Sequence, residues 1–520
     1  MSKLQGRNLV GLIVALTLAA GSASATNGYY TTGTGTKSKA QAGAGSANPQ
    51  EVMSLATNPP NIAFVPDSID AGLGIFSPMR DYETSPSLAN GNGGAFTIGP
   101  NRIDSENEFF PIPFVGMNRA LSDVDYLAAA FYARGGMNTK WVGGTASFDP
   151  DGPGPAPVMT FDGTYGGGTA GVDLMQAFLN LTYARKFNDQ LSLGASAIIA
   201  MQRFEARGVS MFAPYTETFA RSGGTVMPRN LSGNGHDMSY GYGGSVGLQW
   251  NPNEVLSFAA AYTTKMSMDE FGDYADLFAE RGGFDMPATA TVGIAVKPHD
   301  RLALMFDWQE IWYSDVGSVG NPVQNLFSCP TAGFGGTDFE GCLGGNRGGG
   351  FGWDDMTVYK FGASYRLDDT WTLRGGYSFT DQPIPKDQMT FNILAPAVME
   401  DHFSVGLTLG KPGLDLSNLK AGDGTQIVDR TLLHVRRVQK HDQRGDERNN
   451  QRQPKKYSQR GTTTANRNRT SYGDALPAQQ KVKKQCGDRN KYDPLGHAKL
   501  EQKFRTRGQQ GQQPLEAENP

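Results

Sequence analysis

The amino-acid sequence predicts an all-β protein, a transmembrane antiparallel β-barrel. Three observations favour this fold class: segments of about ten residues in which apolar and milder residues alternate, short turns that alternate with long connections, and an export signal. Successive side chains of a strand point to opposite faces, so each segment has one apolar face and one small or polar face. The composition agrees, since 67 glycines and 19% charged residues are unusual for a soluble helical enzyme.

The N-terminal residues 1–25 have the pattern of a signal peptide. Lys3 and Arg7 supply positive charge, residues 9–20 are apolar, and small residues precede the expected cleavage point after Ala25. A membrane anchor is the alternative, but this apolar run is too short to span a bilayer. Because no later run reaches roughly 18 apolar residues, we expect export without a helical anchor.

The alternating segments predict about twelve strands. In residues 191–201, for example, Leu193 and other apolar residues oppose Ser192 and Ser196. The milder face is weakly charged, as expected where a lumen must be filled or kept passable. The predicted strands cover residues 69–77, 108–118, 124–136, 176–187, 190–204, 239–251, 254–268, 287–297, 300–313, 355–367, 370–380 and 401–410.

The apolar face could contact either lipid or a buried core. A soluble β-sandwich alternates in the same way, with its apolar residues inward. The export signal, the number of segments and the aromatic residues near strand ends favour lipid. Short turns also alternate with long connections, as in outer-membrane barrels. The long connections cover residues 137–175, 205–238, 269–286 and 314–354.

Several stretches resemble the FadL/TodX-type outer-membrane transporters of long-chain fatty acids and other hydrophobic compounds. They include "TNGYYTTGTGTKSKAQAGAGSANPQEVMSLATNPPNIAFV", "DLFAERGGFDMPATATVGIAV", "DWQEIWYSDVGSVGNP" and "LRGGYSFTDQPIPKDQMTFNILAPAVMEDHFSVGLTLG". The resemblance spans most of residues 26–410. It implies a bacterial outer-membrane barrel of fourteen strands that is plugged by an N-terminal hatch. Residues 26–66 precede the first strand and are too polar to span, so they either plug the lumen as this hatch or trail outside, and the barrel covers 67–410.

The resemblance implies passive uptake of long-chain fatty acids or other hydrophobic compounds, with rearrangement of the hatch and lateral release through the barrel wall. An apolar chain gains roughly 0.8 kcal/mol per CH₂ on leaving water, so release into the bilayer avoids an uphill exit. The expected partners are a hydrophobic ligand such as a fatty acid, outer-membrane lipid and the barrel-assembly machinery. We expect a monomer that binds no nucleic acid. A surface adhesin or structural barrel and a general diffusion porin are the alternatives.

Two short motifs would control the hatch and the wall. The family's hatch motif is Asn-Pro-Ala, and here Asn58-Pro59-Pro60 departs from it at the third residue. Pro60 removes another N–H and stiffens the turn. Gly135-Gly136 would supply the bend of the kinked third strand, with a simple strand end as the alternative.

Cations that face the lumen would hold an anionic head group. Strand parity directs Arg134, Lys360 and Arg374 inward, where each can bind a carboxylate through charge-assisted hydrogen bonds. Pairing with a lumen carboxylate such as Asp307 is the alternative for each cation.

The long loops would hold the apolar part of a ligand. Phe212, Leu277 and Phe278 are the candidate contacts, the last two on a short amphipathic helix predicted at 273–283. Ordinary packing of the loops against one another is the alternative.

The sequence gives no support for catalysis, a cofactor or a metal. "GTGTKS" lacks the glycine before Lys37 and the preceding strand of a phosphate loop, and no Ser/His/Asp order accompanies a nucleophile elbow. Cys329 and Cys342 lie in a Gly-rich loop, where an oxidising compartment would favour a disulfide. Two free thiols are the alternative.

The alternation ends at Lys411. Residues 411–520 are basic and poor in aromatic residues, whereas the upstream body is acidic, and such a tail cannot bury enough apolar surface to order itself. A frameshift near Lys411 that replaces the last strands is our first interpretation, and a genuine tail on a shortened barrel is the second. A nucleic-acid arm would conflict with the export signal.

Overall fold

A computed structural model describes residues 26–85, 97–148, 155–410, 432–435 and 503–506. The expected signal peptide at 1–25 and most of the expected tail at 411–520 lie outside the described residues. No helix among the described residues is long and apolar enough to cross a membrane.

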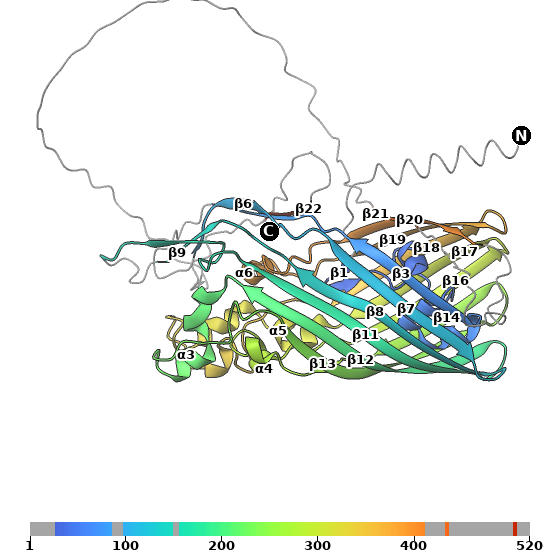
Figure 1. Ribbon diagram of the computed structural model, residues 1–520, viewed down its shortest axis with the longest axis horizontal. Helices are drawn as coiled ribbons and strands as arrows, with labels where there is room; N and C mark the ends of the chain where they lie inside the picture. Colours follow the sequence, from blue (N-terminus) through green and yellow to red (C-terminus); the bar gives the residue numbers. More distant parts are fainter. Residues whose placement is uncertain (1–25, 86–96, 149–154, 411–431, 436–502, 507–520) are drawn as a thin grey trace, which may run out of the picture. The chain divides into compact units, whose positions relative to one another are not determined.

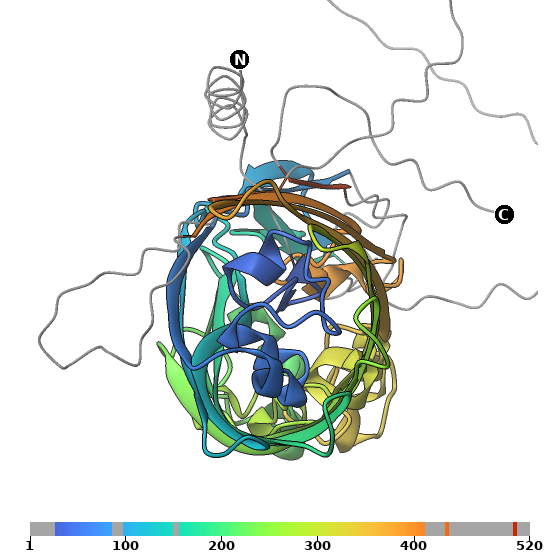
Figure 2. The same ribbon diagram turned by 90° about the vertical axis from the view of Figure 1, so that its right-hand side faces the viewer.

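The predicted strands all occur, and they form one antiparallel sheet that curves into a barrel wall (Figures 1 and 2). The sheet begins at β3, and each wall strand pairs with the next one along the chain. The predicted range 254–268 is two strands, because the residues between them leave the ladder with β13. The strands are β3 (Ser68–Phe76), β7 (Phe110–Ala120), β8 (Asp125–Asn138), β11 (Gly171–Lys186), β12 (Leu191–Arg207), β13 (Asp237–Trp250), β14 (Leu256–Thr263), β15 (Ser267–Met268), β16 (Thr289–His299), β17 (Leu302–Ile311), β18 (Met356–Arg366), β19 (Trp371–Thr380), β20 (Asp401–Leu409) and β21 (Leu432–Val435).

The two faces of the wall differ as the alternation predicts. On β13, the outward side chains of Tyr242 and Val246 are 73% and 56% exposed, whereas the inward Ser239 and Gln249 are fully buried. The other wall strands repeat the outward apolar row, and their inward side chains are small or polar around much of the inner segment but include large apolar ones such as Phe178 and Phe204. A soluble sandwich would bury its apolar face, so this wall is built for contact with lipid.

Short turns close one end of the wall, and three of them use the same side-chain hydrogen bonds. Asn188 Oδ1 accepts hydrogen bonds from the N–H groups of Gln190 and Leu191, both at 2.8 Å. Asn253 and Asp368 accept from the second and third residues that follow them in the same way. The side chains of Asn188, Asn253 and Asp368 therefore fix these tight turns by hydrogen bonds to backbone N–H groups two and three residues further along the chain.

The residues before β3 lie inside the wall, and we refer to residues 26–66 as the inner segment (blue in Figure 2). Most of its residues are buried, including Tyr29, Met53 and Ile62. Its elements are β1 (Thr26–Asn27), β2 (Tyr30–Thr31), α2 (Thr36–Lys39) and two 3-10 helices, Val52–Ala56 and Pro59–Phe64.

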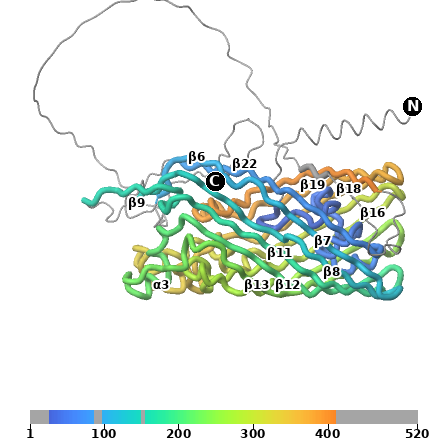
Figure 3. The backbone as a smooth tube through the Cα atoms, in the orientation of Figure 1, coloured from blue at the N-terminus to red at the C-terminus, as the bar shows by residue number. Residues whose placement is uncertain are grey.

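The long connections gather at the other end of the wall and carry short elements of their own (Figures 1 and 3). Small strands form two separate sheets, β22-β4-β6 and β10-β9-β5. Their strands are β4 (Arg80–Thr84), β5 (Thr97–Ile98), β6 (Asn101–Asp104), β9 (Thr145–Phe148), β10 (Met159–Asp162) and β22 (Lys503–Thr506). The helices are α3 (Glu217–Arg221), α4 (Ala279–Gly282), α5 (Gly317–Gly320) and α6 (Met389–Asn392), with 3-10 helices at Ser210–Tyr215, Gly272–Tyr274, Tyr313–Asp315, Val323–Ser328 and Phe339–Gly341.

The prediction of one helix at 273–283 is wrong. Only a 3-10 turn at Gly272–Tyr274 and the short α4 are present, and Phe278 between them is extended. Glu280 and Arg281 have φ of 58°, the left-handed conformation that ends a helix. This backbone follows the burial of Phe278 among other aromatic rings rather than the periodicity of its sequence.

Candidate functional site

The inner segment meets the wall through its Asn58-Pro59-Pro60 motif, which lies over two wall glycines. Gly194 on β12 and Gly247 on β13 are direct cross-strand partners. A Cβ on Gly194 would lie 2.7 Å from the Pro60 nitrogen, and one on Gly247 would lie 2.2 Å from Asn58 Oδ1. The motif fits only where both strands lack a side chain. Both prolines begin the 3-10 helix Pro59–Phe64, where the N–H groups that they lack are not needed.

A second glycine pair receives the inner segment on the far side of the wall. Gly362 on β18 and Gly376 on β19 are also cross-strand partners. A Cβ on Gly376 would lie 2.1 Å from the carbonyl carbon of Gln41, and one on Gly362 would lie 3.2 Å from Gln41 Cβ. The backbone of the inner segment therefore approaches the wall too closely for any larger residue at Gly376.

Asp307 on β17 is held by the inner segment rather than by a wall cation. Its carboxylate accepts hydrogen bonds from Gly45 N–H at 2.9 Å, Ser46 N–H at 2.9 Å and Ser46 Oγ at 2.8 Å. These donors satisfy the buried carboxylate.

The wall opens between β7 and β8. The two strands pair only as far as Phe114 and Tyr132, after which β7 continues alongside β3 alone. On the other edge of β8, the register with β11 shifts so that Arg134 has no partner residue, which is a β-bulge one residue before Gly135.

The hairpin of β1 and β2 occupies the edge of β8 that β7 leaves. Tyr30 is paired with Gly135, and Gly136 N–H donates to the Tyr29 carbonyl at 2.9 Å. A Cβ on Gly135 would lie 2.3 Å from the Tyr29 oxygen. The Gly135-Gly136 pair thus lets the inner segment approach β8 next to the bulge.

The three predicted lumen cations point inward and are buried, but their surroundings differ. The guanidinium carbon of Arg134 lies 3.9 Å from the centroid of the Tyr30 ring, a cation–π contact. Lys360 Nζ donates to the Thr32 carbonyl at 3.3 Å. Arg374 donates to Gln50 Oε1 at 3.0 Å and to the hydroxyl of Thr408.

Arg134 and Lys360 share a cavity between the inner segment and the wall, and Arg374 does not line it. The inner segment contributes one side of the cavity, and β8, β14, β16, β17 and β18 contribute the other. Its lining residues are Thr31, Thr32, Gly33, Thr34, Gly43, Ala56, Thr57, Arg134, Ala261, Thr263, Thr289, Thr291, Gln309 and Lys360.

A second cavity within the inner segment contains Glu51, a buried acid that the sequence did not single out. Its Oε1 accepts hydrogen bonds from the backbone N–H groups of Lys37 at 3.2 Å and Ser38 at 3.4 Å. Burial raises the pKa of Glu51 to about 7, although the nearby charge of Lys37 acts in the opposite direction.

The predicted loop contacts Phe212 and Phe278 are buried in one large aromatic cluster beneath the loops. Phe278 contacts Phe204 and Phe284 at centroid distances of 4.7 and 4.9 Å. Phe212 lies 5.2 Å from Phe391, and Leu277 is partly buried against the same cluster.

The aromatic cluster continues into the inner segment, which sequence reasoning did not predict. Tyr29 lies 5.0 Å from Tyr313 and 5.6 Å from Trp353, between ring centroids. The hydroxyl of Tyr313 donates to the Asn27 carbonyl at 2.6 Å. The strong aromatic content of "TNGYY" and "DWQEIWYSD" was the only signal, and it does not say which rings meet.

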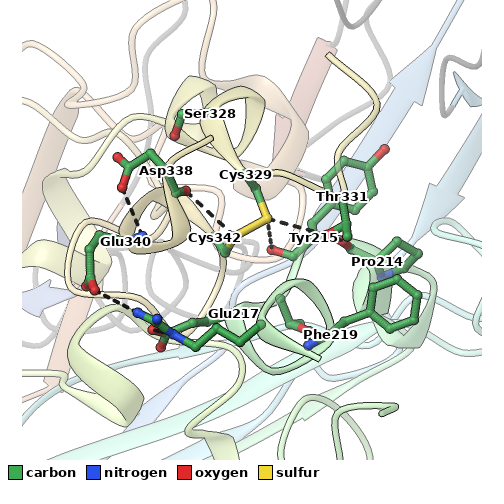
Figure 4. The surroundings of a disulfide bond; sticks show 12 residues. Pro214, Tyr215, Glu217, Phe219, Ser328, Cys329, Thr331, Asp338, Glu340 and Cys342 are labelled. Carbon is green, nitrogen blue, oxygen red and sulfur yellow. Dashed lines mark hydrogen bonds and ion pairs between the residues drawn. A yellow bond between two sulfur atoms is a disulfide. The ribbon is translucent and has the colours of Figure 1, made fainter. Parts of the chain in front are cut away.

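A disulfide joins Cys329 and Cys342 within the connection between β17 and β18 (Figure 4), with the Cα atoms 4.8 Å apart. Both cysteines are fully buried against the connection between β12 and β13. Across this contact, Arg221 of α3 forms an ion pair with Glu340 at 3.0 Å. The disulfide therefore stiffens one loop where it contacts another. No group of three or more His, Cys, Asp or Glu side chains in the described part of the chain is arranged to hold a metal ion.

Comparison with known proteins decides the family. Residues 13–410 match the model of the outer membrane protein transport protein family (OMPP1/FadL/TodX). The chain belongs to this family. The match ends at the residue before Lys411, where the alternation also ends, and the family is one of bacterial outer-membrane proteins. Membership agrees with the outward apolar rows of the wall and with the inner segment within it.

Individual relatives are more distant. The long-chain fatty acid transport proteins of Salmonella typhi and Escherichia coli K12 are 27% and 26% identical over 45% of this chain. The chain spans 56% and 57% of their lengths, a little over half. Among solved structures, a FadL homologue of Pseudomonas aeruginosa is 17% identical with a TM-score of 0.48, covering 74% of this chain and 88% of that one. The toluene transporter TbuX of Ralstonia pickettii is 17% identical with a TM-score of 0.45, covering 74% and 90%.

Proposed function

We propose that the protein is a channel for passive uptake of long-chain fatty acids or other hydrophobic compounds across the outer membrane. The observation that carries the proposal is the position of the cavity shared by Arg134 and Lys360. The cavity lies between the inner segment and the wall, and Arg134 on its lining is the bulged residue beside the opening between β7 and β8. Family membership and the names of the relatives support the same function.

In this proposal, residues 26–66 act as a hatch, residues 67–410 as the barrel and residues 1–25 as the export signal. A ligand is bound first by the loops and then meets the aromatic cluster beneath them, where Phe212, Leu277 and Phe278 would contact it. The hairpin of β1 and β2 then moves away from Gly135 and Gly136, and the ligand leaves sideways between β7 and β8. Lateral release keeps an apolar chain out of water at the exit, at roughly 0.8 kcal/mol per CH₂.

The channel would work as a monomer in contact with outer-membrane lipid after insertion by the barrel-assembly machinery. It would perform no chemical step, since diffusion down a gradient needs neither a catalytic residue nor a cofactor. The disulfide between Cys329 and Cys342 would keep the loops in a shape that receives the ligand.

Uptake by cells tests this function against the adhesin and porin alternatives. The full-length chain is expressed in a strain that lacks its own fatty-acid channel, and uptake of labelled palmitate is measured beside entry of a small hydrophilic sugar. We expect the chain to restore palmitate uptake without admitting the sugar.

A loop deletion sharpens the same test. Removing 222–235, the tip of the connection between β12 and β13, should reduce palmitate uptake only in part. In an adhesin, whose function depends on its loops, the same deletion would abolish surface binding. Failure of the intact chain to restore uptake while it is present and folded in the outer membrane would overturn the proposal. Entry of the sugar would indicate a diffusion porin.

A further inference from the structure

Two prolines of β7 lie where the wall opens. Pro111 and Pro113 belong to the part of the strand that pairs with β3 alone, beyond the last pair with β8, which joins Phe114 and Tyr132. Both prolines are exposed, and their side chains share one face of the strand because they are two residues apart. Proline has no backbone N–H and cannot donate to a neighbouring strand, so within sheets it is confined to edges, strand starts and bulges.

Two hydrogen bonds at the other end of β7 show which way its N–H groups point. β7 lies between β3 and β8 (Figure 1). Ala120 N–H donates at 2.7 Å to Oδ1 of Asp67, the residue before β3, and Leu121 N–H donates at 2.8 Å to the carbonyl of Asp125, the first residue of β8. Successive residues of an antiparallel strand direct their N–H groups to opposite neighbours. Both ladders of β7 keep one register throughout, so its even-numbered residues face β3 and its odd-numbered residues face β8.

Both prolines therefore occupy positions whose N–H would face β8. Val115 is on this side within the ladder, and the next two positions in the same direction are Pro113 and Pro111. At the existing register, residue 113 would lie opposite Ala133 and residue 111 opposite Gly135. The ladder between β7 and β8 thus stops at the first position where β7 has no donor. Pairing with β3 continues past both prolines, as expected when their nitrogens face away from it.

We infer that Pro111 and Pro113 hold the wall open, because they prevent β7 from pairing with the edge of β8 that the hairpin of β1 and β2 occupies. The inference rests on the proposed function and identifies what keeps its exit passable. Tyr30 of the hairpin pairs with Gly135, the residue that position 111 would otherwise reach. When the hairpin leaves, β7 cannot take its place, and the gap remains.

The apolar surroundings of the gap explain why the donors must be absent. The cross-strand partners of the two prolines are Leu73 and Ile75 of β3, which are 65% and 66% exposed on the outer face of the wall. Unpaired N–H groups are costly in such surroundings, so two strand edges that carry them would pair and close the gap. Proline removes the donor itself and leaves a free edge without an unpaired N–H.

The bulge at Arg134 is the competing cause of the gap, since a bulge bends its strand. Restoring the donors separates the two causes. Pro111→Val combined with Pro113→Val supplies both N–H groups on side chains that strands favour. Pro111→Val alone is the matched control, because the remaining Pro113 still interrupts the ladder before it can reach residue 111.

Hydrogen exchange gives a readout that does not depend on transport. Both full-length variants are purified in a non-ionic detergent, folding is checked by heat-modifiable migration in gels, and exchange of the amide at 111 is measured by mass spectrometry. We expect this amide to exchange at least about tenfold more slowly in the double variant than in the single one, because only there does it pair with β8.

Uptake by cells gives the second readout. Two added hydrogen bonds should favour the closed gap enough to reduce palmitate uptake about tenfold in the double variant. Pro113→Val alone adds one pair and should reduce uptake by less. Pro111→Val alone should leave uptake unchanged.

Equal exchange of the amide at 111 in the folded single and double variants would overturn the inference and assign the gap to the bulge. Slower exchange together with undiminished uptake would support the role of the prolines and overturn the proposed exit through the gap. If the unaltered chain takes up no palmitate, the proposed function falls, and the exchange comparison still decides what holds the wall open.

Discussion

The inner segment is held in two different ways along its length. From Gln41 to Pro60 its backbone lies against paired wall glycines, and Asp307 binds the loop between these contacts. The first residues, from Thr26 to Tyr30, are held by one strand pairing, aromatic contacts and single hydrogen bonds. Steric fit resists movement in every direction, whereas separate polar and aromatic contacts can be exchanged one at a time. We therefore divide the inner segment into a fixed part, from Gln41 to Pro60, and a releasable part, from Thr26 to Tyr30.

The largest expected effect comes from filling a glycine of the fixed part. Gly376→Val places side-chain atoms where the Gln41 carbonyl group lies, so the inner segment must shift, at about 3 kcal/mol or more. We expect the variant to admit hydrophilic solutes, measured as ion conductance in planar bilayers. Gly375→Val is the matched control, because a Cβ there has no neighbour closer than 3.8 Å. Equal conductance of the two variants would contradict a steric fit.

Removing the disulfide should loosen the connection between β17 and β18 without disturbing the fixed part. Replacing Cys329 and Cys342 by alanine frees a loop with a sequence separation of 13, at about 2 kcal/mol of local stability. We expect faster protease cleavage within residues 320–350 and an unchanged resistance of the barrel to unfolding in detergent. Loss of barrel stability in the variant would show that loops and wall unfold together.

The buried Glu51 predicts that the fixed part responds to pH. Because burial raises its pKa from 4.5 to about 7, the folded state favours the protonated form, and this stability is lost as the pH rises from about 4.5 through 7. The protection factors of the amides at 36–52, in which the intrinsic pH dependence of hydrogen exchange is divided out, should fall about tenfold across that range. Glu51→Gln should remove the dependence, and a dependence that persists in this variant would assign it to another group.

The smallest effect is expected in the releasable part itself. Tyr30→Phe keeps the ring over Arg134 but removes the hydrogen bond from its hydroxyl to the Pro287 carbonyl, at about 1 kcal/mol. If release of the hairpin limits transport, palmitate uptake should rise up to about fivefold. Tyr30→Leu, which also removes the cation–π contact, should raise it further. Slower uptake in both variants would mean that the hairpin guides the ligand rather than blocks it.

The alternation in the sequence predicted the wall strands and their faces because the period of two is a local property of each strand. It also directed Arg134, Lys360 and Arg374 inward. It could not separate the first two from the third, because that depends on which residues of the inner segment lie opposite each cation. The alternation could not identify the two glycine pairs that receive the inner segment either, since a glycine in a strand can mark a bulge, a bend or a close approach. The predicted helix at 273–283 failed where tertiary burial of Phe278 overrode a local pattern.

The repeated turn at Asn188, Asn253 and Asp368 has a consequence for how the wall is made. Each of these side chains sets the register of one hairpin through contacts two or three residues away. Pairs of neighbouring strands can therefore find their alignment before the remaining strands arrive, with little loop entropy to overcome. Such a chain can insert into the membrane as a series of hairpins whose register is already set. Asn188→Ala should therefore slow the formation of one hairpin without altering the folded wall.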